Sequence, residues 1–76
     1  MNPDQEMLFK AVMDRAQPDK QGEMQSLLKS TIEKVEKSQF SDNDFEEFKS
    51  SVAKFLKPGT ADEIDNDLKH FKRQST

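Results

Sequence analysis

The chain has 76 residues, with 12 lysines and arginines against 15 aspartates and glutamates, a formal net charge of -3 and no cysteine. This length allows one domain with a small core. The absence of cysteine excludes disulfides, thiolate metal sites and thiol nucleophiles.

The first half of the chain predicts two helices. The first covers about 2–16, with Asn2 as its N-cap, Pro3 at the first helical position and Gln5 returning the hydrogen bond in a capping box. The segment 17–22 contains Pro18 and Gly22 and interrupts the helical pattern. The second helix covers about 19–38. Its apolar residues fall on one stripe: Met24, Leu27, Leu28, Ile32 and Val35.

The clearest start signal belongs to a third helix, over about 41–57. Ser41 is the expected N-cap, and Asp44 is placed to return its hydrogen bond. Phe40 and Phe45 flank the cap as a hydrophobic staple. The dipeptide Pro58-Gly59 is expected to end this helix.

A fourth helix is predicted over about 60–73, followed by a frayed tail at 73–76. Thr60 is the expected N-cap, with Glu63 completing a second capping box. No segment alternates like a strand, and the short connections at 38–41 and 57–60 fold consecutive helices back on each other. The predicted fold is therefore all-α: a single domain, 1–76, forming a small bundle of three to four short amphipathic helices with antiparallel neighbours.

Two acidic stretches resemble metal sites only superficially. The acids at 62–67 lie in the first turns of a predicted helix, where they complement its macrodipole and point in different directions. The stretch 40–48, read as the end of a calcium loop, puts Phe40 at a ligand position and Ser41 in place of the required glycine. His70 lacks the partners of a di-metal or general-base site. We therefore predict no metal, no cofactor, no catalytic residue and no enzymatic activity.

Nucleic acid, membrane and small-molecule partners are also not expected. Both helix–turn–helix junctions carry acids where a DNA-reading helix would approach phosphates. Both glycines belong to turns, so no phosphate-cradling loop is present. No basic leader precedes the first helix, and the longest apolar run is Met7–Phe9. We expect neither signal peptide nor membrane span, and a cytoplasmic location.

The first helix has the broadest apolar face. Leu8, Val12 and Ala16 form a core stripe, with further apolar residues at its edge and on its far side, covering roughly 240° against roughly 80–140° for the other helices. All four methionines lie within the first 24 residues. This pattern indicates either a mostly buried helix filled by flexible side chains or an adaptable interface. The candidate partner interface consists of Met7, Phe9, Ala11 and Met13.

These observations favour a non-catalytic protein–protein interaction module, a small regulator or adaptor whose partner is another protein or a second copy. Three alternatives stay open. One is a structural homo-oligomer, such as a homodimer, that completes its core through the first helix. The second is an acidic decoy that binds a basic protein surface. The third is a nucleic-acid binder.

Overall fold

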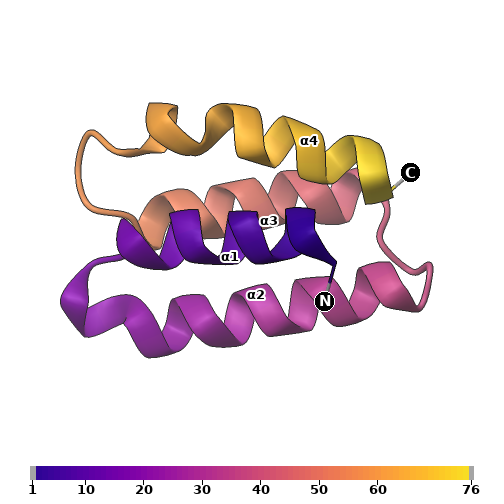
Figure 1. Cartoon of the computed structure of the whole chain (residues 1–76). Coiled ribbons are helices and arrows are strands. Elements are labelled where there is room, and N and C mark those ends of the chain that lie inside the picture. Colours follow the sequence, from indigo (N-terminus) through magenta and orange to yellow (C-terminus); the bar gives the residue numbers. More distant parts are fainter. Residues whose placement is uncertain (1, 76) are drawn as a thin grey trace.

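The computed structural model describes residues 2–75, which form an antiparallel bundle (Figure 1). In chain order the elements are α1 (Pro3–Asp14), the 3₁₀ turn η1 (Pro18–Lys20), α2 (Gln21–Glu36), α3 (Asp42–Phe55), the 3₁₀ turn η2 (Ala61–Ile64) and α4 (Asp65–Ser75). Residues 2–75 contain no strand. The all-α prediction with antiparallel neighbours is confirmed.

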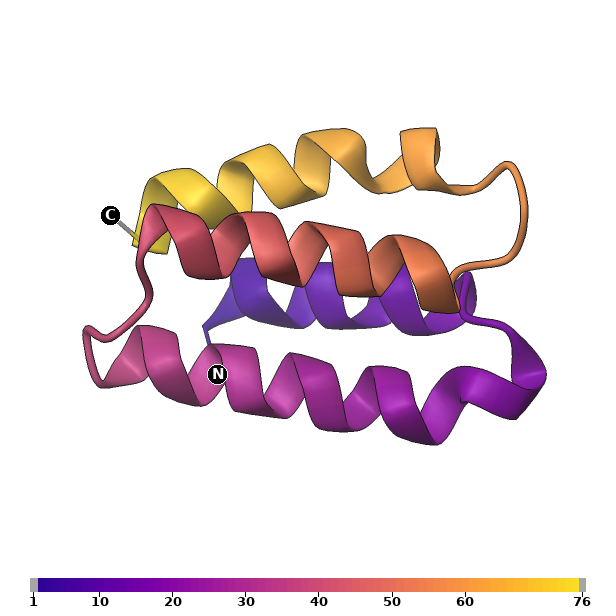
Figure 2. The same ribbon diagram turned by 180° about the vertical axis from the view of Figure 1, so that it is seen from behind.

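The helices occupy the corners of a diamond. α1 packs against both α2 and α4, and α2 packs against α3. α1 and α3 run in the same direction on opposite sides of the bundle, as the two opposite views in Figures 1 and 2 show. None of the helices in the described part of the chain has the length and apolar composition needed to cross a bilayer.

Every helix contributes a stripe at helical spacing to one core. Leu8, Val12 and Ala16 are buried, as predicted for the first helix. The other buried apolar side chains come from α2, α3, α4 and the ends of their connections: Met24, Leu28, Ile32, Phe45, Phe48, Val52, Leu56, Ile64, Leu68 and Phe71. Leu27, at the edge of the α2 stripe, and Val35, in the last turn of α2, are half-buried against this core.

Two of the three predicted capping boxes are confirmed. Asn2 Oδ1 accepts the Gln5 backbone N–H at 2.8 Å, and Gln5 Oε1 accepts the Asn2 N–H at 3.1 Å. Ser41 and Asp44 exchange the equivalent pair, each at 3.1 Å. The rings of the predicted staple, Phe40 and Phe45, meet edge to face with centroids 6.2 Å apart. These signals succeed because they involve residues only a few positions apart.

The predicted capping box at Thr60 and Glu63 is wrong. The Thr60 backbone is already near the helical region (φ -100°, ψ -9°), whereas an N-cap is extended. The Thr60 hydroxyl instead donates to the Lys57 carbonyl at 2.7 Å, and the Glu63 carboxylate accepts from Arg15 Nε at 3.1 Å. The chain enters α4 through the η2 turn, so the α-helix itself begins at Asp65.

The third helix ends at Phe55, before Pro58-Gly59. Leu56 is extended and forms an isolated antiparallel bridge with Ala16. The Gln17 N–H donates to the Phe55 carbonyl at 2.9 Å, and the Lys57 N–H donates to the Arg15 carbonyl at 2.8 Å. The helix thus ends two residues before the predicted end at 57, where the chain pairs with the segment that follows α1.

The end of α2, in contrast, is formed by residues close together in the sequence. α2 closes with Ser38 in the left-handed region (φ 57°), while the Ser38 and Gln39 N–H groups bond the Val35 and Lys34 carbonyls at 3.0 and 2.8 Å. This is a Schellman motif with serine at the position that glycine prefers. α4 continues to Ser75, beyond the predicted end at 73. Met1, and Thr76 of the predicted tail 73–76, lie outside the described residues.

Candidate functional site

The four residues of the predicted interface on α1 do not form one exposed apolar patch. Met7 is 61% exposed and is the one large hydrophobic side chain described as exposed. Phe9, Ala11 and Met13 are half-buried and pack against the core. The broad apolar face of α1 has a structural reason, because this helix packs against α2 on one side and α4 on the other. That these four residues bind a partner stays a prediction.

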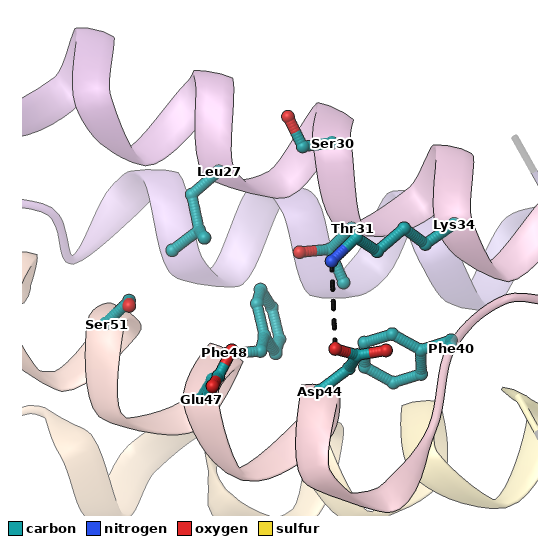
Figure 3. A pocket seen from close by; sticks show the side chains of 9 residues that line it. All are labelled: Leu27, Ser30, Thr31, Lys34, Phe40, Asp44, Glu47, Phe48 and Ser51. Carbon is teal, nitrogen blue, oxygen red and sulfur yellow. Dashed lines mark ion pairs between the residues drawn. The ribbon is translucent and has the colours of Figure 1, made fainter.

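A second candidate surface is the groove between α2 and α3, which holds a hollow of about 150 Å³ (Figure 3). Three apolar side chains line it: Leu27 from α2, Phe48 from α3 and Phe40 from the connection between them. Figure 3 shows Leu27 pointing from α2 toward the ring of Phe48. The other lining residues are polar: Ser30, Thr31, Lys34, Asp44, Glu47 and Ser51. We call this hollow and its lining the α2–α3 groove.

The aromatic floor of the α2–α3 groove is fixed from below. The rings of Phe40 and Phe48 each lie with their centroids 5.8 Å from that of Phe71 on α4. Phe40 also contacts Phe45, whose ring has the ammonium groups of Lys49 and Lys72 at 5.3 and 5.2 Å from its centroid. Aromatic and cation–π contacts of this kind favour one ring arrangement. The two rings of the floor are therefore packed from below by Phe71.

The charges on the rim of the groove differ in how they are paired. Lys34 Nζ lies 3.7 Å from Asp44 Oδ1, shown as the dashed line in Figure 3. The Ser41 N–H and hydroxyl hold the pKa of Asp44 below its ordinary value, with a smaller effect from Lys34. Glu47 is exposed and forms no ion pair or hydrogen bond within the described residues. The groove thus carries one carboxylate, that of Glu47, with no ion-pair partner among residues 2–75.

The acidic stretch at 62–67 is divided between two elements, with Asp62 and Glu63 in the η2 turn and Asp65 and Asp67 in the first turn of α4. Glu63 pairs with Arg15 at 3.1 Å and Asp65 pairs with Lys69 at 3.3 Å, so two of its acids serve different cations. No group of three or more histidine and acidic side chains positioned for a metal occurs in the part of the chain that the structure describes. His70 is exposed on α4 and borders a separate shallow hollow of about 190 Å³.

One further ionic contact affects titration on α2. Lys37 Nζ donates to Glu33 Oε1 at 2.8 Å across one helical turn. This hydrogen bond lowers the pKa of Glu33 and raises the pKa of Lys37. Both side chains are exposed, so the pair belongs to the solvated surface of α2.

Comparison of the chain with protein-family models, with curated proteins and with solved structures finds no match. Sequence reasoning missed the α2–α3 groove, although one signal was present. Leu27 lies at the edge of its apolar stripe, beside the small side chains of Ser30 and Thr31.

Proposed function

We propose that the chain is a non-catalytic protein-binding module and that its binding surface is the α2–α3 groove. The observation that carries this proposal is an apolar floor, formed by Leu27, Phe40 and Phe48, at the bottom of an open hollow with a polar rim. The rings of Phe40 and Phe48 both pack against Phe71. Protein interfaces concentrate their binding energy where an apolar anchor of one partner enters such a pocket of the other.

The chemistry of the groove favours binding over catalysis. Its hydroxyls belong to Ser30, Thr31 and Ser51, and a hydroxyl becomes a nucleophile only beside a general base. Hydrogen bonds with Ser41 lower the pKa of the rim carboxylate of Asp44, which makes this carboxylate a poor base at neutral pH. His70 borders a different hollow on α4. An apolar floor with a polar rim suits recognition of a side chain.

The α1 surface offers less to a partner. A single exposed methionine, Met7, stands on a helix whose Phe9, Ala11 and Met13 are already packed against the core. Because those three side chains have exchanged part of their water for protein contacts, they retain less apolar area for a partner. The groove is therefore the stronger candidate, and α1 serves as the comparison surface in the experiment.

The experiment uses the whole chain as bait with the groove filled or left open. Ser51 points from α3 toward the groove (Figure 3), so Ser51→Phe should fill the hollow. Ser26→Phe is the matched control, because Ser26 is an exposed serine of α2 that does not line the groove. Met7→Lys tests the α1 surface. Circular dichroism first verifies that all three variants are folded.

Proteins retained from a lysate of cells that express the chain are then quantified by mass spectrometry. We expect a partner that is retained by the wild type, Ser26→Phe and Met7→Lys and is lost with Ser51→Phe. A partner lost with Met7→Lys but kept by Ser51→Phe would overturn the choice of surface. If no protein is retained above background, the chain is not a protein-binding module under those conditions and the proposal fails.

A further inference from the structure

We propose that the occupant of the α2–α3 groove is an amphipathic helix that inserts one apolar side chain against Phe48 and sets a lysine or arginine one turn away against Glu47. This inference rests on the proposed function and specifies the chemistry of the partner. Three features of the groove support it: the volume of the hollow, its uncompensated charge and the shape of its walls.

The volume of the hollow matches one side chain. It measures about 150 Å³, with Leu27, Phe40 and Phe48 as its apolar lining. An engineered apolar cavity of about 150 Å³ in another protein accepts benzene, which sets the scale. The hollow therefore has room for a single leucine, methionine or phenylalanine side chain. A larger apolar cluster would stay outside.

The unpaired charge of the groove is complementary to a cation. The lining contains Lys34, Asp44 and Glu47, and the first two are paired with each other at 3.7 Å. One turn before Glu47 lies Asp44 and one turn after it lies Ser51. Lys54 of α3 lines a neighbouring hollow together with Glu47, but the two side chains form no ion pair. The nearby Lys49 lies 3.4 Å from Glu46 instead. A basic residue of the partner would pair with the one rim charge that has no ion pair within residues 2–75.

The walls of the groove favour a helix as the occupant. The lining residues run from Leu27 to Lys34 on α2 and from Asp44 to Ser51 on α3, which is two helical turns, or about 10 Å, on each wall. Two turns are enough for an anchor and a charge spaced at i and i+4. An extended peptide gains its affinity from backbone hydrogen bonds at a sheet edge, and helical walls present no such edge.

The test titrates the ¹⁵N-labelled full chain with two synthetic helical peptides by NMR. Both peptides carry the same leucine anchor; one has lysine four positions after it and the other has glutamate there. We expect the lysine peptide to shift the amide signals of residues 27–34 and 44–51. We further expect it to bind about fivefold more tightly than the glutamate peptide, which is the scale of one exposed ion pair.

Two substitutions of exposed carboxylates decide whether Glu47 is responsible. Glu47→Gln should reduce the preference for the lysine peptide to less than about twofold, since the ion pair is removed. Glu36→Gln is the matched control, because it removes the same charge from an exposed position of α2 outside the groove and should keep the preference. An unchanged preference in Glu47→Gln would overturn the assignment of this residue.

The outcomes also separate this inference from the proposed function. If both peptides shift the groove signals with equal affinity, the groove binds an apolar anchor as proposed, and the inference of a basic partner is wrong. If neither peptide shifts residues 27–34 and 44–51, or the shifts cluster on α1, the helix-in-groove inference is wrong as well. In that case the bait experiment with Ser51→Phe still decides the proposed function.

Discussion

Replacing Phe48 with alanine tests whether the groove floor is also part of the core. Phe48 is 3% exposed, and its ring lies 5.8 Å from that of Phe71 on α4. Truncating a buried phenylalanine removes its transfer free energy and leaves a cavity, which together cost about 3–5 kcal/mol. At roughly 0.05–0.15 kcal/mol per residue, a chain of 76 residues has a total stability of about 4–11 kcal/mol. The variant should therefore lose about a third of its stability or more.

Phe55 provides the internal comparison on the same helix. It is only half-buried, so Phe55→Ala should cost less than Phe48→Ala, about 1–3 kcal/mol. Urea unfolding followed by far-UV circular dichroism measures both, since the chain has neither tryptophan nor tyrosine for fluorescence. With a slope of about 1 kcal/mol per M, the midpoint of Phe48→Ala should fall by about 3 M or more. A loss below about 1 kcal/mol, or a larger loss in Phe55→Ala, would mean that α3 buries a different face.

Three smaller substitutions test the helix ends and the α1 surface. Ser41→Ala should destabilise the chain by about 1 kcal/mol in the same urea assay, because α3 loses its cap. The lowered pKa of Asp44 means that its share of this stabilisation is fully present above the unfolded pKa near 3.8 and disappears as the pH falls through the lower folded value. The Asp44 carboxylate accepts the Ser41 backbone N–H, which Ser41→Ala keeps, so Asp44→Asn is the variant whose stability difference from the wild type should shrink in acid. A difference independent of pH would contradict this explanation. Ser38→Gly should increase the free energy of unfolding by about 0.5–1 kcal/mol and so raise the thermal midpoint, since glycine adopts φ 57° without strain. A lower thermal midpoint would refute this prediction. Met7→Lys should change the urea midpoint by no more than about 0.5 kcal/mol, because the side chain is 61% exposed, and a clear loss of stability would show that Met7 is packed.

The sequence was informative wherever a feature depends on neighbouring residues. The caps of α1 and α3 were predictable because Asn2 with Gln5 and Ser41 with Asp44 lie three positions apart. The same pattern at Thr60 failed because distant contacts decide the local structure. Arg15 donates a hydrogen bond to the Glu63 carboxylate, and Leu56 forms a bridge with Ala16 shortly before the chain enters the η2 turn. A capping hydrogen bond competes with such tertiary contacts for the same side chain. A sequence pattern reveals the possible cap but not the tertiary contact.

The candidate site was harder to predict, for a related reason. The periodicity of α1 indicated a wide apolar face, but not that two helices, α2 and α4, would both pack against it. The α2–α3 groove arises from the way two helices meet, with Leu27 at one edge and Phe48 opposite. Neither residue is unusual in its own helix. A groove depends on the relative rotation of its walls, which hydrophobic periodicity only approximates.

The most direct test of the central claim, that the α2–α3 groove is the binding surface, compares filled and open grooves with one probe. The affinity of the lysine peptide is measured by NMR titration for the wild type, Ser51→Phe and the control Ser26→Phe. We predict the same dissociation constant for the wild type and Ser26→Phe, and a value at least about tenfold higher for Ser51→Phe, which corresponds to about 1.4 kcal/mol. Equal binding by all three proteins would contradict the claim, because the peptide would then occupy another surface.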